Sequence, residues 1–421
     1  PLYEGGMELM SQEQWRRVDV LRRVEAGALT RGEAAQVLGL SKRQVRRLVG
    51  ALVREGPSAL IHGNSKRAPV NKLPDELRKR ILELHGRKYA GFNDQHFTEK
   101  LEKEGIEVSR SSVRRLLREA GLRAVRRRRA PKHRRRRDRK AQAGMMILWD
   151  GSRHDWLEDR GPRLCLMGAI DDATGEVLPG AHFVEQECAA GYLKTLRAIV
   201  LAKGVPLSAY MDQHGSLKRN DDYWSLEEEL RGERDPTQVG RALNLLRIEP
   251  IFALSPQAKG RVERLWGTLQ DRLVSELRLA GASTRSEADA VLTRYLPEHN
   301  ARFAVTPAET SSAWRPLRKT VDVDRICSFY YPRVVQNDNT IQVAGSTIDI
   351  PPAPGRATFA RATVEVRQLL DGSWRVYSED QLVATAAATT EGDLRTLKVT
   401  KAETRRRYQQ RKAMQREAAL G

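Results

Sequence analysis

Between residues 145 and 277 the chain alternates short apolar runs with segments of helical periodicity, and this order restricts the fold more than any other feature. Three runs of strand length come first, and helical and strand patterns then alternate. The predicted strands are MMILWD, PRLCLMGAID, EVLPGAHFV, LSAYMD and IEPIF. The predicted helices cover residues 189–203, about 237–246 and about 258–277.

Three consecutive strands followed by alternating helices and strands form a mixed sheet covered by helices. This is the layout of the ribonuclease-H-like fold. We therefore predict an α/β domain of this class over residues 143–305.

Three carboxylates of this domain are candidates for chemistry. Asp150 closes the first predicted strand, Asp212 closes the fourth, and Glu263 lies at the margin of the apolar stripe of the last helix. No basic residue follows Glu263 at the helical spacing that would neutralise it. Three converging carboxylates are costly unless a cation neutralises them. Oxygen ligands favour Mg²⁺ or Mn²⁺, and two such ions suit in-line displacement at phosphorus.

Other acids of this domain have simpler interpretations. Asp171 and Asp172 precede Ala-Thr-Gly at a predicted hairpin, where Asp commonly supports the turn, so a structural role is predicted. Three acids of a charged loop are alternatives to Asp150 only if the strand boundary is misplaced by several residues: Asp155, Glu158 and Asp159.

Three further polar residues lie beside the candidate acids in the sequence. His214 follows Asp212 by two residues, and it could contact a scissile phosphate or lie in a surface loop. Lys259 and Arg261 precede Glu263 and are expected to contact DNA.

The first 60 residues predict a helix-turn-helix module, over residues 7–60. Capping-box spacings at Thr30/Glu33 and Ser41/Gln44 mark two helix starts, with a tight turn at Gly39 between them. The start of the last helix would meet the DNA major groove. Its exposed candidates are Lys42, Arg43, Gln44, Arg46 and Arg47. The alternative is a generic three-helix bundle with a solvated basic face.

A similar helical module is predicted over residues 70–122. Its exposed basic set would be Arg110, Ser112, Arg114 and Arg115. Two tandem modules could bind a longer DNA site than either alone.

The positive charge is concentrated between the helical modules and the α/β domain. Residues 123–140 contain 12 Lys/Arg and one Asp, so this segment contributes +11 of the formal net charge of +20. A linker over residues 123–142 could be disordered, or it could neutralise DNA phosphates. The candidate contacts are Arg127, Arg128, Arg135 and Arg136.

Four motifs carry a resemblance to a known family: WDGS (149–152), IDDATG (170–175), YMDQHG (210–215) and SPQAKGRVER (255–264). They resemble the DDE transposases of bacterial insertion sequences, which are related to retroviral integrases, and within them the ISNCY-type group. The likeness extends over nearly the whole chain. It implies that Asp150, Asp212 and Glu263 are the catalytic, metal-binding acids, with two Mg²⁺ or Mn²⁺ ions. The 50 residues between the last two acids exceed the usual integrase spacing, and residues 221–236 look like a polar insertion.

The resemblance also implies a function. The amino-terminal modules would bind the terminal inverted repeats of the element, and the three acids would hydrolyse a phosphodiester to free a 3′-OH that attacks target DNA. Joining two ends implies at least a dimer, with catalysis in cis or in trans left open. The alternatives are a non-catalytic DNA-binding regulator derived from such an element, and a ribonuclease-H-like nuclease without strand transfer.

The carboxy-terminal region predicts a small all-β barrel over residues 320–390, because short alternating runs flank a turn at Asp371–Gly372. In the resembling family this domain is SH3-like and helps to bind DNA. A basic helical tail, residues 391–421, could contact DNA or serve assembly. Three scattered cysteines argue against a disulfide framework or a zinc site. No apolar run approaches the roughly 20 residues of a membrane span, so a cytoplasmic location is expected. The resemblance implies a bacterial, nucleoid-associated protein.

Overall fold

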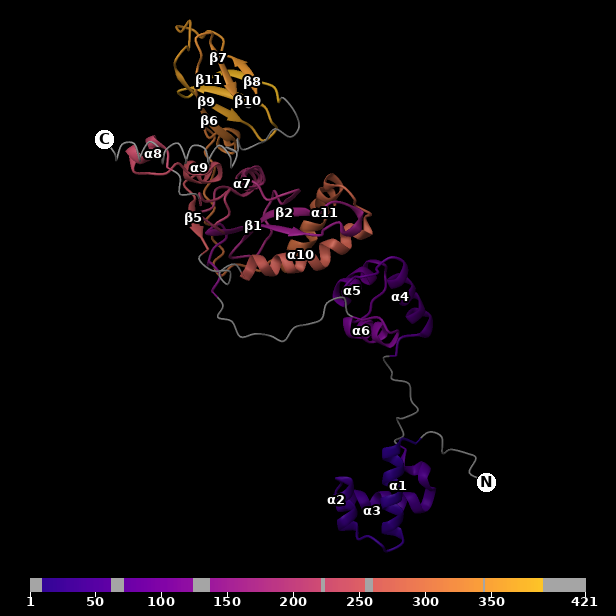
Figure 1. Ribbon diagram of the computed structural model, residues 1–421. Helices are drawn as coiled ribbons and strands as arrows, with labels where there is room; N and C mark the ends of the chain where they lie inside the picture. Colours follow the sequence, from indigo (N-terminus) through magenta and orange to yellow (C-terminus); the bar gives the residue numbers. More distant parts are fainter. Residues whose placement is uncertain are drawn as a thin grey trace, which may run out of the picture. The chain divides into compact units, whose positions relative to one another are not determined.

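The computed structural model describes residues 10–61, 72–123, 137–220, 224–253, 260–343 and 345–388. The chain divides into two compact units, Pro1–Ile81 and Leu82–Gly421, and this division falls inside helix α4 (Asp75–Arg87). Figure 1 gives the element labels. Among the described helices, none has both the length and the apolar character that a membrane span needs.

The first unit contains the predicted helix-turn-helix, which is confirmed. Its elements are α1 (Gln12–Glu25), α2 (Arg31–Leu38), α3 (Lys42–Glu55) and a 3-10 turn, η1 (Pro57–Leu60). Thr30 and Glu33 cap α2 reciprocally, since each side chain binds the backbone N–H of the other, at 3.2 and 2.7 Å. Gly39 ends α2 at φ +64°, a left-handed conformation that favours glycine. Ser41 then caps α3, 3.2 Å from the Gln44 amide.

The second unit is built around a five-stranded sheet of order β3-β2-β1-β4-β5. Its strands are β1 (Met146–His154), β2 (Leu164–Asp171), β3 (His182–Val184), β4 (Ser208–Met211) and β5 (Glu249–Phe252). The first three strands are antiparallel neighbours, whereas β4 is parallel to both β1 and β5. This is the mixed sheet predicted for the ribonuclease-H-like fold, and that fold class is confirmed.

Helices cover both faces of the sheet (Figure 1). They are α7 (Ala189–Lys203), α9 (Gln238–Leu245), α10 (Gly260–Leu279) and α11 (Arg285–Phe303). A further short helix, α8 (Leu226–Arg231), leaves its Leu226 and Leu230 side chains exposed. Ile147 and Trp149 of β1 pack in one cluster with α7 and α9, whereas Met146 and Leu148 pack in another with α10 and α11. Successive strand residues point to opposite faces, and both faces are apolar here. The near-continuous apolar runs of the sequence follow from this burial.

Several predicted bounds are wrong. β1 continues to His154, so Asp150 lies within the strand and not at its end. The extension forms because β2 pairs with β1 as far as His154. β3 is only three residues long, and Val177 of its predicted start makes an isolated bridge to Ile170. Two helices were not predicted: α11, which follows the last predicted helix of this domain, and α8, which lies within the 221–236 segment.

Helices α5 (Asp94–Lys103) and α6 (Arg110–Glu119) of the second helical module belong to the same compact unit as the sheet. Arg272 of α10 donates two hydrogen bonds to Glu99 of α5, at 2.7 and 3.0 Å, and both side chains are buried. Glu276, one turn further along α10, lies 2.7 Å from both His96 Nε2 and Lys100 Nζ. Buried charges are stable only when paired in this way, so these contacts fix α5 on α10.

The carboxy-terminal region is the predicted small all-β domain, which is confirmed. Its elements are α12 (Val323–Ile326), β6 (Phe329–Val334), β7 (Thr340–Val343), β8 (Ser346–Asp349), β9 (Thr363–Gln368), β10 (Trp374–Ser378) and β11 (Gln381–Ala386). The described strands form a four-stranded antiparallel sheet of order β11-β10-β9-β6 and the β7-β8 hairpin.

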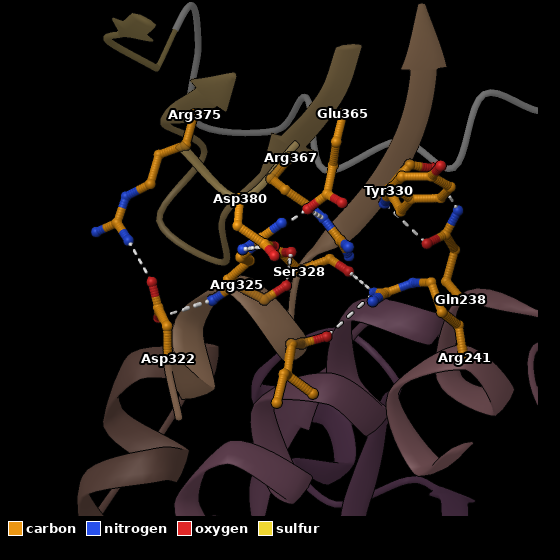
Figure 2. Close-up of polar contacts among 11 residues, drawn as sticks. Gln238, Arg241, Asp322, Arg325, Ser328, Tyr330, Glu365, Arg367, Arg375 and Asp380 are labelled. Carbon is orange, nitrogen blue, oxygen red and sulfur yellow. Dashed lines mark hydrogen bonds and ion pairs between the residues drawn. The ribbon is translucent and has the colours of Figure 1, made fainter. Parts of the chain in front are cut away.

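Polar contacts from α9 hold this β domain against the central domain (Figure 2). The Gln238 amide binds both backbone groups of Tyr330, accepting from its N–H at 2.8 Å and donating to its C=O at 2.9 Å. Arg241 donates to the carbonyls of Ile326, at 3.1 Å, and Ser328. A side-chain amide therefore pairs with the edge of β6 in place of a neighbouring strand.

Candidate active site

Asp150 and Asp212 come from adjacent parallel strands. The register pairs Met146 with Ser208 and Leu148 with Tyr210. Continued by two residues, this register sets Asp150 opposite Asp212, on strands about 4.8 Å apart. Both carboxylates are half-buried. Asp155, which follows the true end of β1, lies five residues beyond this register position and is the weaker candidate.

Each of the two carboxylates accepts a hydrogen bond that fixes its position. The indole Nε1 of Trp266, a buried residue of α10, donates to Asp150 Oδ2 at 3.0 Å. The backbone N–H of His214 donates to Asp212 Oδ1 at 3.0 Å. Helix α10 and the loop after β4 thus orient the two acids.

Glu263 lies in the first turn of α10, where its side chain is exposed. It precedes Trp266 by three residues, a spacing that makes the two side chains neighbours on the helix surface. Among the described residues, no group of three His, Cys, Asp or Glu side chains is arranged to hold a metal ion. Glu263 as the third carboxylate stays a prediction.

A further carboxylate near the two Asp residues, Glu187, was missed by sequence reasoning. It accepts a hydrogen bond from the Tyr192 hydroxyl, and His214 Nδ1 lies 3.6 Å from its Oε1. A Cβ atom added to Gly151 would lie 3.0 Å from its Oε2. Burial raises the pKa of the Glu187 carboxyl, and the negative charges of Asp212 and Asp150 raise it further, against the opposing effects of Tyr192 and His214. The one sequence signal was an acid just before a predicted helix.

The donor set at this end of the sheet suits a hard divalent cation. Asp150 and Asp212 supply carboxylate oxygens, the ligands that Mg²⁺ and Mn²⁺ prefer. Beside the larger effect of burial, the charges of Asp212 and Asp150 also raise the pKa of the Glu187 carboxyl, so the three acids repel one another. A cation would relieve that repulsion.

The structural role predicted for the Asp171–Asp172 pair is confirmed. Asp171 accepts hydrogen bonds from the backbone amides of Gly144, Ala173 and Thr174, at 2.7, 2.9 and 3.0 Å. The Ala173 and Thr174 bonds close the turn after β2, and the Gly144 bond ties Asp171 to the segment before β1.

Asp172 is fully buried and forms ion pairs with Arg137 and Arg261, at 2.5 and 2.6 Å. Arg261, an expected DNA contact, therefore ties the first turn of α10 to the β2 turn. In the charged loop, Glu158 pairs with Arg278 and Arg160, each at 2.7 Å. The Arg278 bond holds the loop on α10, whereas Arg160 belongs to the loop itself.

The expected DNA-contacting residues of the helical modules lie on exposed surfaces. In α3 all five predicted side chains are exposed: Lys42, Arg43, Gln44, Arg46 and Arg47. In α6, Arg110 and Arg114 are exposed, Arg115 lies 3.9 Å from Glu119, and Ser112 lies at the helix start beside its cap, Ser109. The other predicted contacts lie outside the described residues: Arg127, Arg128, Arg135, Arg136 and Lys259.

Comparisons with known proteins give a family for the chain. Residues 17–79 match the family described as winged helix-turn helix. The chain is 38% identical over 318 residues to the putative transposase y4bF of Sinorhizobium fredii (strain NBRC 101917 / NGR234), covering 75% of this chain and 68% of the relative. It is 33% identical over 323 residues to the transposase for insertion sequence IS1202 of Streptococcus pneumoniae, covering 68% and 67%.

Among solved structures, the simian T-cell lymphotropic virus intasome is similar with a TM-score of 0.31 and 14% identity, over 73% of this chain and 99% of that one. The identity to two transposases, each covered over about two thirds of its length, decides the relationship. The chain belongs to the insertion-sequence transposase family.

Proposed function

We propose that the protein is a DNA transposase that binds the terminal inverted repeats of its element, cleaves to free a 3′-OH and transfers that 3′-OH into target DNA. Asp150, Asp212 and Glu263 are its catalytic and metal-binding acids. The observation that carries the proposal is the register that sets Asp150 opposite Asp212, with α10 bound to Asp150 through Trp266, in a chain of this family. Within the family, the motifs WDGS, IDDATG, YMDQHG and SPQAKGRVER resemble those of the ISNCY-type group, and this resemblance supports the proposal that the protein belongs to that group.

The residues of the chain orient the acids before substrate binds. Trp266 binds one oxygen of Asp150, and the His214 amide binds one oxygen of Asp212, so both carboxylates are held in position by the protein itself. Such preorganisation avoids reorganisation during the reaction. Two bound divalent cations would activate an attacking oxygen and stabilise a leaving one at phosphorus.

The partners are double-stranded DNA and a second copy of the chain on the paired ends. Along the chain, the proposed domains are a DNA-binding module at 7–60, a second module at 70–122, a basic linker at 123–142, the catalytic core at 143–305, the β domain at 320–390 and a basic tail at 391–421. The exposed basic residues of α3 support DNA binding by the first module, because such a helix start meets the major groove.

The test is end joining by the full chain with Mg²⁺ or Mn²⁺, a pre-cleaved inverted-repeat duplex and a plasmid target. Wild type is compared with Asp150→Asn, Glu263→Gln and the control Asp159→Asn, an exposed acid of the charged loop. We expect metal-dependent joined products from wild type and the control alone. Tight duplex binding without any joining would point instead to a non-catalytic regulator. Joining that survives Glu263→Gln but not Asp150→Asn would move the third position to another acid, with Glu187 the next to test.

A further inference from the structure

A groove of about 550 Å³ separates the second helical module from α10. Its walls include Arg110 and Arg114 of α6, Arg123 just after α6, and Thr268 and Asp271 of α10. The buried Glu99–Arg272 contact and the Glu276 contacts fix α5 on α10, and these contacts hold the module that carries α6 beside α10.

The charges that line the groove do not balance. Of the two acids in its walls, Asp94 forms an ion pair with Arg118 at 2.8 Å. Asp271 accepts a hydrogen bond from the neutral Asn93 amide at 2.6 Å, which does not offset its charge, so one acid opposes the arginines of the groove. The three arginines Arg110, Arg114 and Arg123 are exposed and form no ion pair with any described residue. The groove therefore presents uncompensated positive charge, which suits a polyanion.

The groove also lies next to the candidate acids along α10. Thr268 follows Trp266, which binds Asp150, by two residues, and Gln270 donates to Ser152 of β1 at 3.2 Å. From Glu263 to Thr268 the helix rises about 8 Å. This distance is about two base-pair steps of duplex DNA, at roughly 3.4 Å each.

We propose that this groove binds the phosphate backbone of duplex DNA and directs it along α10 to the acids of the same subunit. The inference rests on the proposed transposase function and names the path of its substrate. Arg110 and Arg114, one turn apart on α6, each neutralise a phosphate. The second module thus serves the active site of its own chain.

The first test measures duplex binding by the full chain as a function of salt concentration. The double variant Arg110→Ala/Arg114→Ala is compared with wild type and with Arg294→Ala, which removes an exposed arginine of α11 outside the groove. Each lost phosphate contact lowers the slope of log K against log salt by about 0.9. We expect the double variant to lose about 1.8 and the control to keep the wild-type slope.

An unchanged slope in the double variant, with salt-dependent binding by wild type, overturns the groove and leaves the proposed function standing. Binding of poly-glutamate, a model of an acidic protein segment, is measured for the same proteins. If the double variant loses poly-glutamate binding but binds DNA as wild type does, the groove holds an acidic protein segment and the proposal is overturned. Wild-type protein without salt-dependent duplex binding overturns both proposals.

The second test addresses the same-subunit path by mixing variants. The double variant keeps its acids, and Asp150→Asn keeps its groove, so neither has both features in one chain. We expect no joined product from the mixture, although each variant mixed with wild type gives product. Joining by the mixture of the two variants overturns the path within one subunit.

Discussion

Arg272 of α10 donates two hydrogen bonds to Glu99 of α5, which joins residues 173 positions apart in the sequence. Arg302 of α11 adds a third contact to the same carboxylate, at 2.7 Å. The side chain of Glu99 is 5% exposed, so its charge depends on these partners. The Arg272 hydrogen bonds and the positive neighbours outweigh the effect of burial, and the pKa of Glu99 is lowered.

Removing the charge of Glu99 should destabilise the second unit strongly. Glu99→Gln leaves Arg272 buried without a counter-ion, a change that costs about 3–5 kcal/mol. Urea unfolding and hydrogen exchange of the α5 amides measure this loss. The matched control is Lys103→Ala, which breaks the more exposed Lys103–Glu298 pair between α5 and α11 and should cost less than about 1 kcal/mol. Equal effects of the two variants would contradict a buried, charge-dependent junction.

Glu158 gives a prediction for pH dependence. Hydrogen bonding from Arg278, with a second bond from Arg160, lowers the pKa of Glu158 from 4.5 to about 2. Because the folded pKa is depressed, this contribution to stability is complete above pH 4.5 and is lost as pH falls toward 2. The pair is about one-third exposed, so the contribution is below about 1 kcal/mol.

The measurement is the unfolding free energy of wild type and Glu158→Gln between pH 7 and pH 2. We expect the difference between them to be constant down to about pH 4.5 and to vanish by about pH 2. A difference that stays constant over the whole range would show that ionisation of Glu158 contributes nothing to the loop contact with α10.

The sequence predicted the elements whose pattern is local. Helix α7 has the predicted bounds, 189–203, because its apolar periodicity is continuous and Gly204 stops it. The last residues of β1, Gly-Ser-Arg-His, carry no strand pattern and are extended only because β2 lies beside them. Asp150 and Asp212 could be predicted because both are near the carboxyl ends of apolar runs.

The remaining features depend on tertiary contacts that no short pattern encodes. Glu187 reaches the two Asp residues only because the chain returns from β3 into α7 beside β1. Glu99 and Arg272 each resemble an ordinary solvated charge on a helix, and only their contact across 173 positions makes them buried. The contact between the second module and α10 could therefore not be predicted from the sequence.

The hydrogen bonds of the Gln238 amide give a prediction for the contact between α9 and strand β6 of the β domain. Gln238→Ala removes the partners of both backbone groups of Tyr330 (Figure 2), and groups left unpaired when partly buried cost about 1–3 kcal/mol. Hydrogen exchange at the Tyr330 amide should become faster by about tenfold or more. Asn244→Ala, an exposed change on the same helix, is the control and should leave that rate unchanged. Unchanged exchange in Gln238→Ala would contradict the strand-like pairing.

Trp266 should matter to the reaction and not only to packing. Trp266→Phe keeps an aromatic ring in the cluster but removes the donor to Asp150 Oδ2. A hydrogen bond to a charged group contributes about 1.5–3 kcal/mol, which corresponds to a joining rate lower by about 10- to 100-fold. The rate is measured at saturating DNA and metal, beside the unfolding free energy. Gln270→Ala, one turn along α10, removes a neutral hydrogen bond to Ser152 and should change the rate by only a few fold. If both variants slow joining equally, or if the joining rate falls only in proportion to the unfolding free energy, Trp266 acts through packing. A loss of joining rate confined to Trp266→Phe means that the indole N–H orients Asp150 for the reaction.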